Sequence, residues 1–469
     1  MIGSLTTGAW DATRNMAEAL TSPFRDPVVR LGVTGLSRAG KTVFITSLVA
    51  NLMDRGRMPQ LRAAAEGRIQ AAWLQPQPDD TVARFAFEEH LAALTAPEPH
   101  WPEGTRRVSQ LRLSLRLAPT GLLGGLSGPR TLHLDIVDYP GEWLLDLGLL
   151  DKDFAEWSAG ALAKARTRPG SEEFLRRLGG LDPGAPLEEV ALKGLAEAYA
   201  AHLRIAREAG YSDCTPGRFL LPGDMEGSPA LTFAPLPPTP EATRRSLWRE
   251  SERRFEAYKR LVVKPFFREH FARIDRQVVL VDVLGALAQG PRAFEDLRGA
   301  MADILGAFNP GRSAWLARLL GQRRVDRILL AATKADHLHH SQHGRLAALV
   351  EALLREAKDR AEFAGAETEA MAIASLRTTV EDRMEHGGLM LDMVRGRLPN
   401  GKQVAQHPGD LPEDPGRILA PARQGVEDWP LQDFAVRDFA PAPLTLRPGE
   451  GPPHIRLDKA AEFLIGDLL

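Results

Sequence analysis

Apolar residues along the chain fall into short runs separated by glycine-rich and charged stretches. The run at residues 28–33 has the composition of a buried strand, and the later run VFITSLVANL is typical of a helix packed on a core. Residues 108–117 and 131–137 alternate apolar and polar positions, which predicts two neighbouring strands. Further apolar runs near Val278, at 327–332 and at 371–374 predict additional strands, so we expect an α/β protein.

The stretch between residue 142 and the run near Val278 has apolar residues at spacings of three and four, which predicts helices. A proline-rich segment at 231–242 separates the last of these helices from the others. Beyond residue 387 we expect short strands and loops, a hairpin turn at 399–402 and a closing helix. The predicted parts are an N-terminal amphipathic helix (1–25), a core in two pieces (26–141 and 273–380), a helical insertion (142–272), a strand- and loop-rich appendage (381–456) and a C-terminal helix (457–469).

Composition limits the classes of protein to which the chain can belong. Its 469 residues exceed one typical hydrophobic core, and 44% of them are hydrophobic. The net charge of -2 argues against nucleic acid as a main partner, and the single cysteine, Cys214, excludes internal disulfides. No apolar run is long enough to cross a bilayer, so we expect a cytoplasmic protein whose N-terminal helix packs on its own core rather than on a membrane surface.

The stretch GLSRAGKT, directly after the first apolar run, has the spacing of a phosphate loop. Glycines let backbone N–H groups curl around a polyphosphate, Lys41 would bring a positive charge to the β and γ phosphates, and Thr42 would ligate magnesium. An ordinary glycine turn is the alternative, but the strand before the loop and the helix after it favour phosphate binding. The predicted phosphate-binding residues are Gly35, Ser37, Arg38, Ala39, Gly40, Lys41, Thr42 and Val43.

A second motif, DYPG, ends the alternating stretch at 131–137. Asp138 is expected to hold the magnesium shell. The backbone N–H of Gly141 is expected to reach the γ phosphate, a close approach that a side chain would prevent. The four residues alone match any proline–glycine turn. The magnesium and phosphate roles are predicted because the motif ends a strand and follows a phosphate loop in the chain.

A third motif, ATKAD, follows the apolar run at 327–332 and resembles a guanine-recognition loop. The Asp336 carboxylate can accept hydrogen bonds from the ring N–H and the exocyclic amine of guanine, a pair of donors that adenine lacks. Lys334 is expected to lie along the base, and Thr333 stands where asparagine is usual. The predicted base-binding residues are Thr333, Lys334, Asp336 and His337. Ser375 and Leu376 of MAIASLRTT are also predicted to contact the guanine oxygen through the backbone, although this stretch departs from the usual Ser-Ala-Lys.

The order of these motifs resembles a Ras-like GTPase core, and together with WPEGTRRVSQLRLSL they are similar to the YcjX-like family of bacterial GTP-binding proteins. The resemblance covers most of the chain. It implies a Ras-like P-loop NTPase core that binds GTP or GDP with Mg²⁺, a stress-linked role and a peripheral inner-membrane partner. Because the insertion directly follows DYPG, we expect it to bind an effector protein when the nucleotide changes.

Three residues are predicted to act in slow GTP hydrolysis, namely Lys41, Thr105 and Glu142. Thr105 is the expected threonine of an enlarged switch I and a magnesium ligand beside Thr42 and Asp138, with Thr81 as a rival. Glu142 follows DYPG, where small GTPases carry a glutamine that orients water. A carboxylate there either accepts a proton or repels the transition state, and a surface residue that starts a helix is the alternative.

Two other functions stay open: a nucleotide-gated scaffold with little turnover, which recruits protein or membrane, and a P-loop ATPase. One further pattern is HLHHSQH at 337–343, in which His339 and His343 are spaced to share a helical face. Because the stretch brings no cysteine or carboxylate with it, we interpret these residues as loop histidines rather than a metal site.

Overall fold

The computed structural model describes residues 26–36, 38–119, 128–239, 243–270, 273–306, 325–424 and 429–469. The helix predicted at 1–25 and Ser37 lie outside these residues. Within the described ranges, every helix is too short or too polar to span a bilayer.

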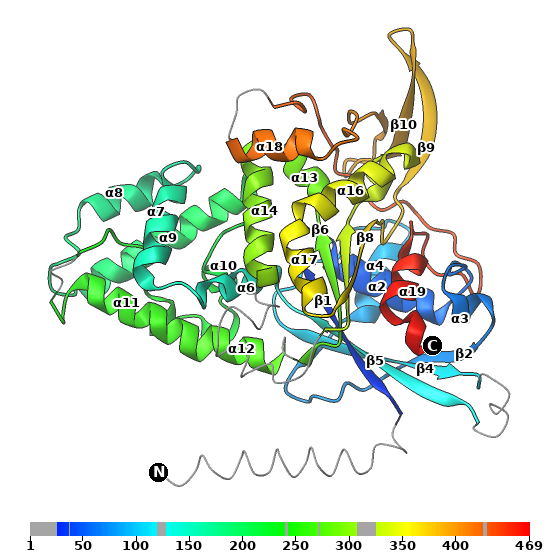
Figure 1. The fold of residues 1–469 in the computed structure, drawn as a ribbon, viewed down its shortest axis with the longest axis horizontal. Helices are drawn as coiled ribbons and strands as arrows, with labels where there is room; N and C mark the ends of the chain where they lie inside the picture. The colour runs from blue at the N-terminus through cyan, green and yellow to red at the C-terminus, as the bar shows by residue number, and fades with distance from the viewer. Residues whose placement is uncertain are drawn as a thin grey trace.

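An eight-stranded sheet runs through the centre of the fold (Figure 1). Its strands are β1 (Val28–Gly35), β2 (Ile69–Gln75), β3 (Ala83–Arg84), β4 (Ser109–Leu117), β5 (Arg130–Asp138), β6 (Arg276–Val281), β7 (Arg327–Ala332) and β8 (Glu367–Ala372). They lie in the order β2-β4-β5-β1-β6-β7-β8, with β3 beside β4. β5, β1, β6, β7 and β8 are parallel, whereas β4 pairs antiparallel with β2 and β5. This is the predicted Ras-like P-loop NTPase core, extended at one edge by β2.

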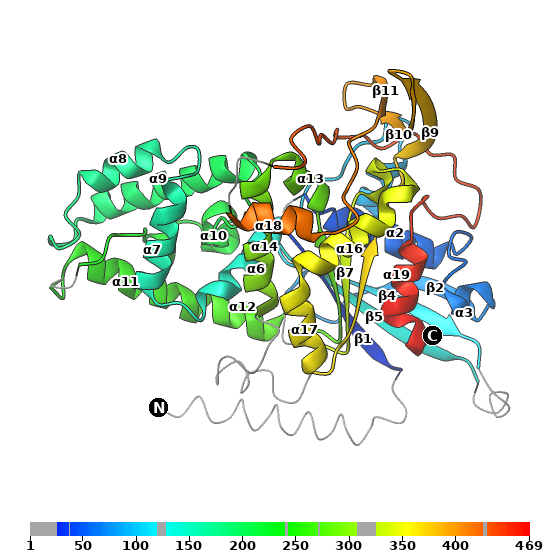
Figure 2. The same ribbon diagram turned by 45° about the horizontal axis from the view of Figure 1, so that its top comes forward.

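Alternate residues of the central strands pack against opposite helical layers, as the period of two in a strand requires. Val278 and Leu280 of β6 belong to the cluster around helix α2, whereas Val279 and Val281 belong to the cluster on the other face. The first layer contains α2 (Lys41–Met53), α3 (Arg62–Ala65), α4 (Phe87–Thr95) and α19 (Leu457–Ile465). The second contains α13 (Val283–Ala288), α14 (Pro291–Gly306), α16 (His343–Leu353) and α17 (Arg355–Phe363), and Figure 2 shows α19 and α17 on opposite sides of the sheet.

Most predicted strands are confirmed, and the differences have physical causes. β1, β4, β5 and β7 match the predicted stretches, but β8 begins before residue 371. β6 stops at Val281 because the Asp282 carboxylate accepts a hydrogen bond from the Gly285 amide at 2.9 Å and caps α13. β2 was not predicted, because most of its residues are half-buried and show no regular alternation.

Helices fill the segment between β5 and β6, as predicted, and form the left half of Figure 1. They are α6 (Gly141–Leu145), α7 (Phe154–Ala165), α8 (Glu172–Gly179), α9 (Glu189–Glu208), α10 (Gly217–Leu220), α11 (Leu247–Tyr258) and α12 (Lys264–Glu269). The 3₁₀ turns η2 (Asp146–Leu149), η3 (Gly223–Met225) and η4 (Pro229–Leu231) and a π turn, η5 (Lys259–Val263), lie among them. Trp157 stacks on Phe255 with ring centroids 5.0 Å apart, and Phe233 meets both edge-on. These rings belong to the same hydrophobic cluster as the second face of the sheet.

A three-stranded antiparallel sheet follows the core, in the order β11-β10-β9. It contains β9 (Thr379–His386), β10 (Leu389–Arg397) and β11 (Gln403–Gln406), and the β9–β10 hairpin projects from the body of the molecule (Figure 1). The predicted turn at 399–402 is confirmed, because the Leu398 amide donates to the Lys402 carbonyl at 2.9 Å. Helix α18 (Gly416–Gln424) was not predicted, because Pro421 lies inside it.

A buried carboxylate ties η2 to the helices that follow it. Asp146 accepts a hydrogen bond from the Gly217 amide at 2.8 Å and another from the Tyr258 hydroxyl at 2.5 Å. These bonds explain why the stretch WLLDLGLL breaks into α6 and a 3₁₀ turn instead of one helix. Burial raises the pKa of Asp146 from 3.8 to about 7, although both hydrogen bonds act in the opposite direction.

We predict that Asp146 makes stability fall as the pH rises. Because its pKa is raised on folding, the folded chain binds more protons than the unfolded chain between about pH 4 and pH 7, so the free energy of unfolding decreases across that window. Asp146→Asn keeps an acceptor for Gly217 and should flatten this dependence. Urea denaturation at about pH 5 and pH 8 measures the change. The exposed Asp151→Asn is the control, and a pH dependence in Asp146→Asn as steep as in the control would contradict the prediction.

Candidate nucleotide-binding site

The predicted phosphate loop connects the end of β1 to the start of α2. Gly40 has φ 82°, in the left-handed region that favours glycine, and α2 begins at Lys41. The Lys41 ammonium is buried and donates hydrogen bonds to the Gly35 carbonyl at 2.7 Å and the Leu36 carbonyl at 3.5 Å. Thr42 is buried in the first turn of α2, whereas Arg38 is exposed. The lysine therefore lies inside the loop, beside the helix N-terminus where anions bind.

The DYPG turn lies against this loop, backbone to backbone. A Cβ atom added to Gly141 would lie 2.2 Å from the Gly35 carbonyl oxygen and 2.9 Å from Leu36 Cα. Backbone atoms cannot rotate away as a side chain can, so only glycine fits at position 141. The carboxyl ends of β1 and β5 are thus held together by a contact that a side chain would break.

Asp138 and Thr105 meet beside the loop. The Thr105 hydroxyl donates to Asp138 Oδ2 at 2.6 Å, and Asp138 Oδ1 has no hydrogen-bond partner among the residues described. Burial raises the pKa of Asp138 to about 6, while the charge of Lys41 and the bond from Thr105 lower it. The rival Thr81 is exposed and donates to Asp79 at 2.6 Å in a local turn. Thr105 is therefore the threonine that contacts Asp138.

Glu142 is buried, so its interpretation as a surface residue is wrong. Its carboxylate accepts a hydrogen bond from Arg207 of α9 at 3.1 Å. A Cβ atom added to Gly217 would lie 1.9 Å from the Glu142 carbonyl oxygen. The insertion therefore packs directly on the backbone and the side chain of this residue.

The ATKAD loop connects β7 to α16. Lys334 has φ 59°, and its ammonium contacts the Asp282 carboxylate at 2.5 Å. The loop is attached to β6 through Thr333, whose amide donates to the Val281 carbonyl at 3.0 Å. Lys334 thus joins the ends of β6 and β7.

Asp336 is buried, and one of its oxygens is already held. Asp336 Oδ2 accepts from the Thr378 amide at 2.8 Å and from the Thr378 hydroxyl at 2.7 Å. Thr378 follows Ser375 and the buried Leu376 in the loop after β8, so this loop does meet the ATKAD loop. His337 is also buried, and its ring is nearly perpendicular to that of Phe439, with the ring centroids 5.1 Å apart. Burial lowers the pKa of His337.

A cavity of about 370 Å³ lies where these segments converge. Its lining includes residues of the phosphate loop (Leu36, Arg38, Ala39), the ends of β6 and β7 (Asp282, Lys334, His337), the insertion (Glu142, Arg207, Tyr211), α13 and α14 (Gly285, Leu297, Met301) and the appendage (Val436, Asp438). Lys41, Thr42, Asp138 and Asp336 are not among the residues that line it. Ligands of open α/β sheets bind at the carboxyl ends of the strands, which is where this cavity lies.

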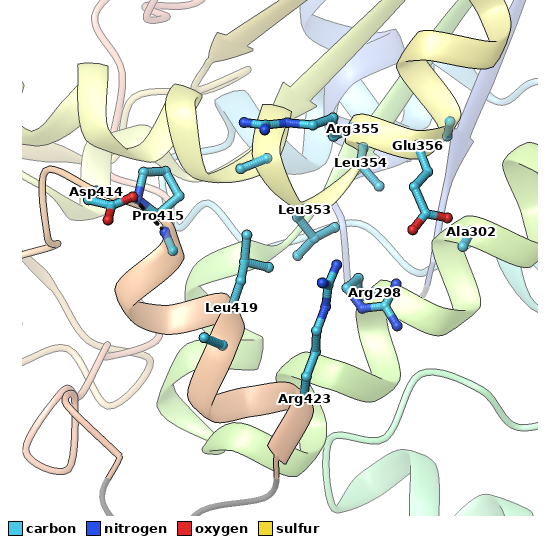
Figure 3. Close-up of a pocket in the computed structure, with 14 residues that line it drawn as sticks. Arg298, Ala302, Leu353, Leu354, Arg355, Glu356, Asp414, Pro415, Leu419 and Arg423 are labelled. Carbon is cyan, nitrogen blue, oxygen red and sulfur yellow. Dashed lines mark hydrogen bonds between the residues drawn. The ribbon is translucent and has the colours of Figure 1, made fainter.

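A second cavity, of about 420 Å³, lies between α14, α17 and α18 (Figure 3). Leu353, Leu354 and Leu419 line it together with Arg298 and Arg423. Arg298 is paired with Glu295 at 2.6 Å, and Arg423 is exposed. Its lining includes no residue of the phosphate loop or of ATKAD, so it is separate from the candidate nucleotide site.

Comparison with known proteins gives the family. The chain matches the YcjX-like family, DUF463, over residues 29–469. It belongs to the YcjX-like family. Ras-like GTPase YcjX of Escherichia coli (strain K12) is 38% identical over 478 residues, which cover 97% of this chain and 99% of the relative. Ras-like GTPase YcjX of Shewanella oneidensis is 36% identical over 479 residues, which cover 97% of each chain. The resemblance to this family that the sequence motifs indicated is confirmed.

Several residues of this YcjX-like site were not found from the sequence. They are Arg207, Thr378 and Asp282, which hold Glu142, Asp336 and Lys334 respectively. Arg207 and Glu142 are 65 residues apart in the sequence, so no local pattern connects them. For Thr378 and Asp282 a signal did exist, because Asp282 directly follows the strand near Val278 and Thr378 lies in the loop after the strand predicted at 371–374, at the sheet edge where the motifs meet.

His339 and His343, whose spacing suits one face of a helix, do not share one. His339 precedes α16, which begins at His343. His343 Nε2 instead contacts the Ala335 carbonyl at 2.7 Å. His339 and His340 lie beside Glu381 of β9, a carboxylate that the local sequence does not reveal.

We predict that Gly141→Ala destabilises the fold. The new Cβ must displace the backbone of the phosphate loop, and overpacking of this kind costs about 1–3 kcal/mol. Gly160→Ala is the matched control, because a Cβ at Gly160 of α7 meets nothing within 4 Å and alanine suits a helix. Urea denaturation of both variants measures the effect. A Gly141→Ala variant as stable as Gly160→Ala would contradict the close contact.

Proposed function

We propose that this YcjX-like protein binds GTP with Mg²⁺ and hydrolyses it slowly, acting as a nucleotide-dependent switch. One observation carries the proposal: a phosphate loop with a buried lysine and a buried aspartate held by Thr378 both lie at the carboxyl ends of parallel strands. The name of the two relatives, Ras-like GTPase, supports guanine nucleotide as the ligand.

Guanine selectivity is assigned to Asp336. Thr378 holds Oδ2 from two directions and so fixes the plane of the carboxylate. Guanine offers two adjacent donors to such a carboxylate, whereas adenine would leave the buried charge without them. Lys334, fixed by Asp282, would lie along the base with its methylene groups.

Phosphate and magnesium binding are assigned to the residues around the phosphate loop. Lys41 would exchange the Gly35 and Leu36 carbonyls for phosphate oxygens, and the amide of Gly141 would approach the γ phosphate. Thr42, Asp138 and Thr105 are suited to hold Mg²⁺, because Asp138 Oδ1 is a buried oxygen with no hydrogen-bond partner among the described residues. A bound Mg²⁺ would neutralise the negative charge of the phosphates.

Slow turnover follows from the environment of Glu142. The carboxylate is held by Arg207 and buried beneath the insertion, so it is not free to orient water in this conformation. Hydrolysis would require α6 to move relative to α9. We therefore propose that Glu142 acts only after its contact with Arg207 changes.

The same contacts support an effector role for the insertion. Trp143 donates from Nε1 to the Leu221 carbonyl at 2.9 Å, and the Arg218 guanidinium lies 3.3 Å from the centroid of the Trp143 ring. Together with Glu142 and Asp146, Trp143 links the segment after DYPG to α9, α10 and α11 of the insertion. A displacement of Gly141 by the γ phosphate would therefore be transmitted to α9 and α10.

We predict guanine-selective binding that depends on Asp336. Calorimetric titration in Mg²⁺ should give heat with GDP and a non-hydrolysable GTP analogue but not with their adenine counterparts. Asp336→Asn should weaken guanine nucleotide binding by about 100-fold and shift preference toward xanthine nucleotides, because the amide donates where the carboxylate accepted.

The exposed Asp359→Asn on α17 is the matched control and should bind guanine nucleotides as the unchanged protein does. Equal binding of adenine and guanine nucleotides would favour a P-loop ATPase. Guanine binding without release of phosphate over hours would favour a nucleotide-gated scaffold.

We predict that Arg207 sets the relative affinity for GTP and GDP. Arg207→Ala leaves the Glu142 charge uncompensated near the phosphate loop, which should weaken binding of the GTP analogue about tenfold relative to GDP. Adding Glu142→Gln to Arg207→Ala should restore the ratio, because it removes the unpaired charge. Arg204→Ala, also on α9 and exposed, is the control. An unchanged ratio in Arg207→Ala would exclude an electrostatic role for the pair.

A further inference from the structure

A cluster of two histidines and a glutamate lies at the base of the β9–β10 hairpin, outside the nucleotide site. His339 and His340 precede α16, and Glu381 lies on β9. One potential ligand atom from each residue lies within 4.8 Å of the other two. Two imidazoles with one carboxylate are a ligand set used by zinc sites that keep an open coordination position.

The distances within the cluster suit a metal ion. His340 Nδ1 lies 2.8 Å and His339 Nε2 lies 3.7 Å from the same oxygen, Glu381 Oε2. Donors about 2.0–2.1 Å from a tetrahedral Zn²⁺ lie about 3.3 Å from each other, a value between these two distances. A shift of a few tenths of an ångström would bring both pairs to that separation.

Neighbouring groups already orient the three side chains. Glu381 Oε1 accepts from the backbone N–H of His340 at 3.0 Å, which turns Oε2 toward the imidazoles. His339 Nδ1 lies 2.9 Å from the Ser341 hydroxyl and 3.4 Å from Asp392 Oδ2 of β10. When the proton of His339 is on Nδ1, it is donated to one of these two groups, and the lone pair of Nε2 is available to a metal. The Ser341 amide, which lies 3.4 Å from Nδ1, then loses this nitrogen as a hydrogen-bond acceptor.

We propose that His339, His340 and Glu381 bind a divalent transition-metal ion of the Zn²⁺ type. His339 would bind through Nε2, His340 through Nδ1 and Glu381 through Oε2, with water in the remaining position. Asp392 is a positioning residue that acts through His339, although it also pairs with Arg383 at 2.7 Å. Imidazole nitrogens favour Zn²⁺, Co²⁺ or Ni²⁺ over Mg²⁺, which prefers oxygen ligands.

The proposed site would connect two parts of the structure. His339 comes two residues after His337 of the ATKAD loop, whereas Glu381 and Asp392 belong to the projecting hairpin. Thr379, the first residue of β9, already donates its hydroxyl to the Asp336 carbonyl. A bound metal would therefore fix the base of the hairpin against the segment that follows the guanine-recognition loop.

The test is titration of the nucleotide-free full chain with ZnCl₂, in excess Mg²⁺ so that magnesium occupies oxygen-rich sites. We expect one equivalent to bind, and Co²⁺ in its place should give the visible absorption of a four- or five-coordinate ion. His340→Ala and Glu381→Gln should each weaken binding about 100-fold, and Asp392→Asn about tenfold, the loss typical of a group that orients a ligand. His340 is two-thirds exposed (66%), so its replacement should not unfold the chain.

His100→Ala, which removes an exposed histidine elsewhere, is the matched control and should bind Zn²⁺ unchanged. Circular dichroism checks that each variant is folded. Binding that survives in both His340→Ala and Glu381→Gln would overturn the proposal, as would a Co²⁺ spectrum of a six-coordinate, water-like ion. Because the titration contains no nucleotide, its outcome does not depend on the proposed GTPase function.

Discussion

The contact between two glycine backbones at the carboxyl ends of β1 and β5 determines the arrangement of the rest of the site. Gly141 lies against Gly35 so closely that no side chain fits between them. The start of α6 is therefore fixed relative to the phosphate loop, and Glu142, Trp143 and the insertion are positioned from there. In the function proposed above, a γ phosphate would approach the amide of Gly141 beside this contact, and a shift of Gly141 would shift the start of α6 with it.

The buried charged side chains of the candidate site are each held by a hydrogen-bond partner, and for the two aspartates that partner comes from a different segment. Lys41 is held by the carbonyls of its own loop, Asp138 by Thr105 and Asp336 by Thr378. Buried charges require such partners, because an unpaired charge in the interior is costly. The site thus depends on loops that meet only in the folded chain. The appendage also contributes, since Val436 and Asp438 line the same cavity as the phosphate loop.

The sequence predicts the features that depend on residues close together in the chain. The phosphate loop, DYPG and ATKAD are contiguous motifs that follow strands of clear periodicity, and their convergence is a consequence of parallel strand order. Partners that are distant in the sequence could not be predicted, as for Arg207 beside Glu142 and Glu381 beside His339. The break of α6 into a 3₁₀ turn escaped prediction for the same reason, because the hydrogen bonds to Asp146 come from residues 71 and 112 positions away.

One hydrophobic cluster joins the insertion to the sheet, and it limits where the chain can be cut into separate domains. Phe154, Trp157 and Phe255 of the insertion share one continuous apolar interior with Val279 and Val281 of β6. Excising the helices would expose to water only the part of this apolar interior that they cover, because α13, α14, α16 and α17 lie on the second face of the sheet independently of the insertion. The isolated helices would in turn lack the surface on which they pack. The insertion is therefore not a detachable module. Neither part can be removed without leaving apolar side chains of the other exposed to water, so the boundary at residue 142 marks a change of secondary structure rather than a gap in the hydrophobic interior.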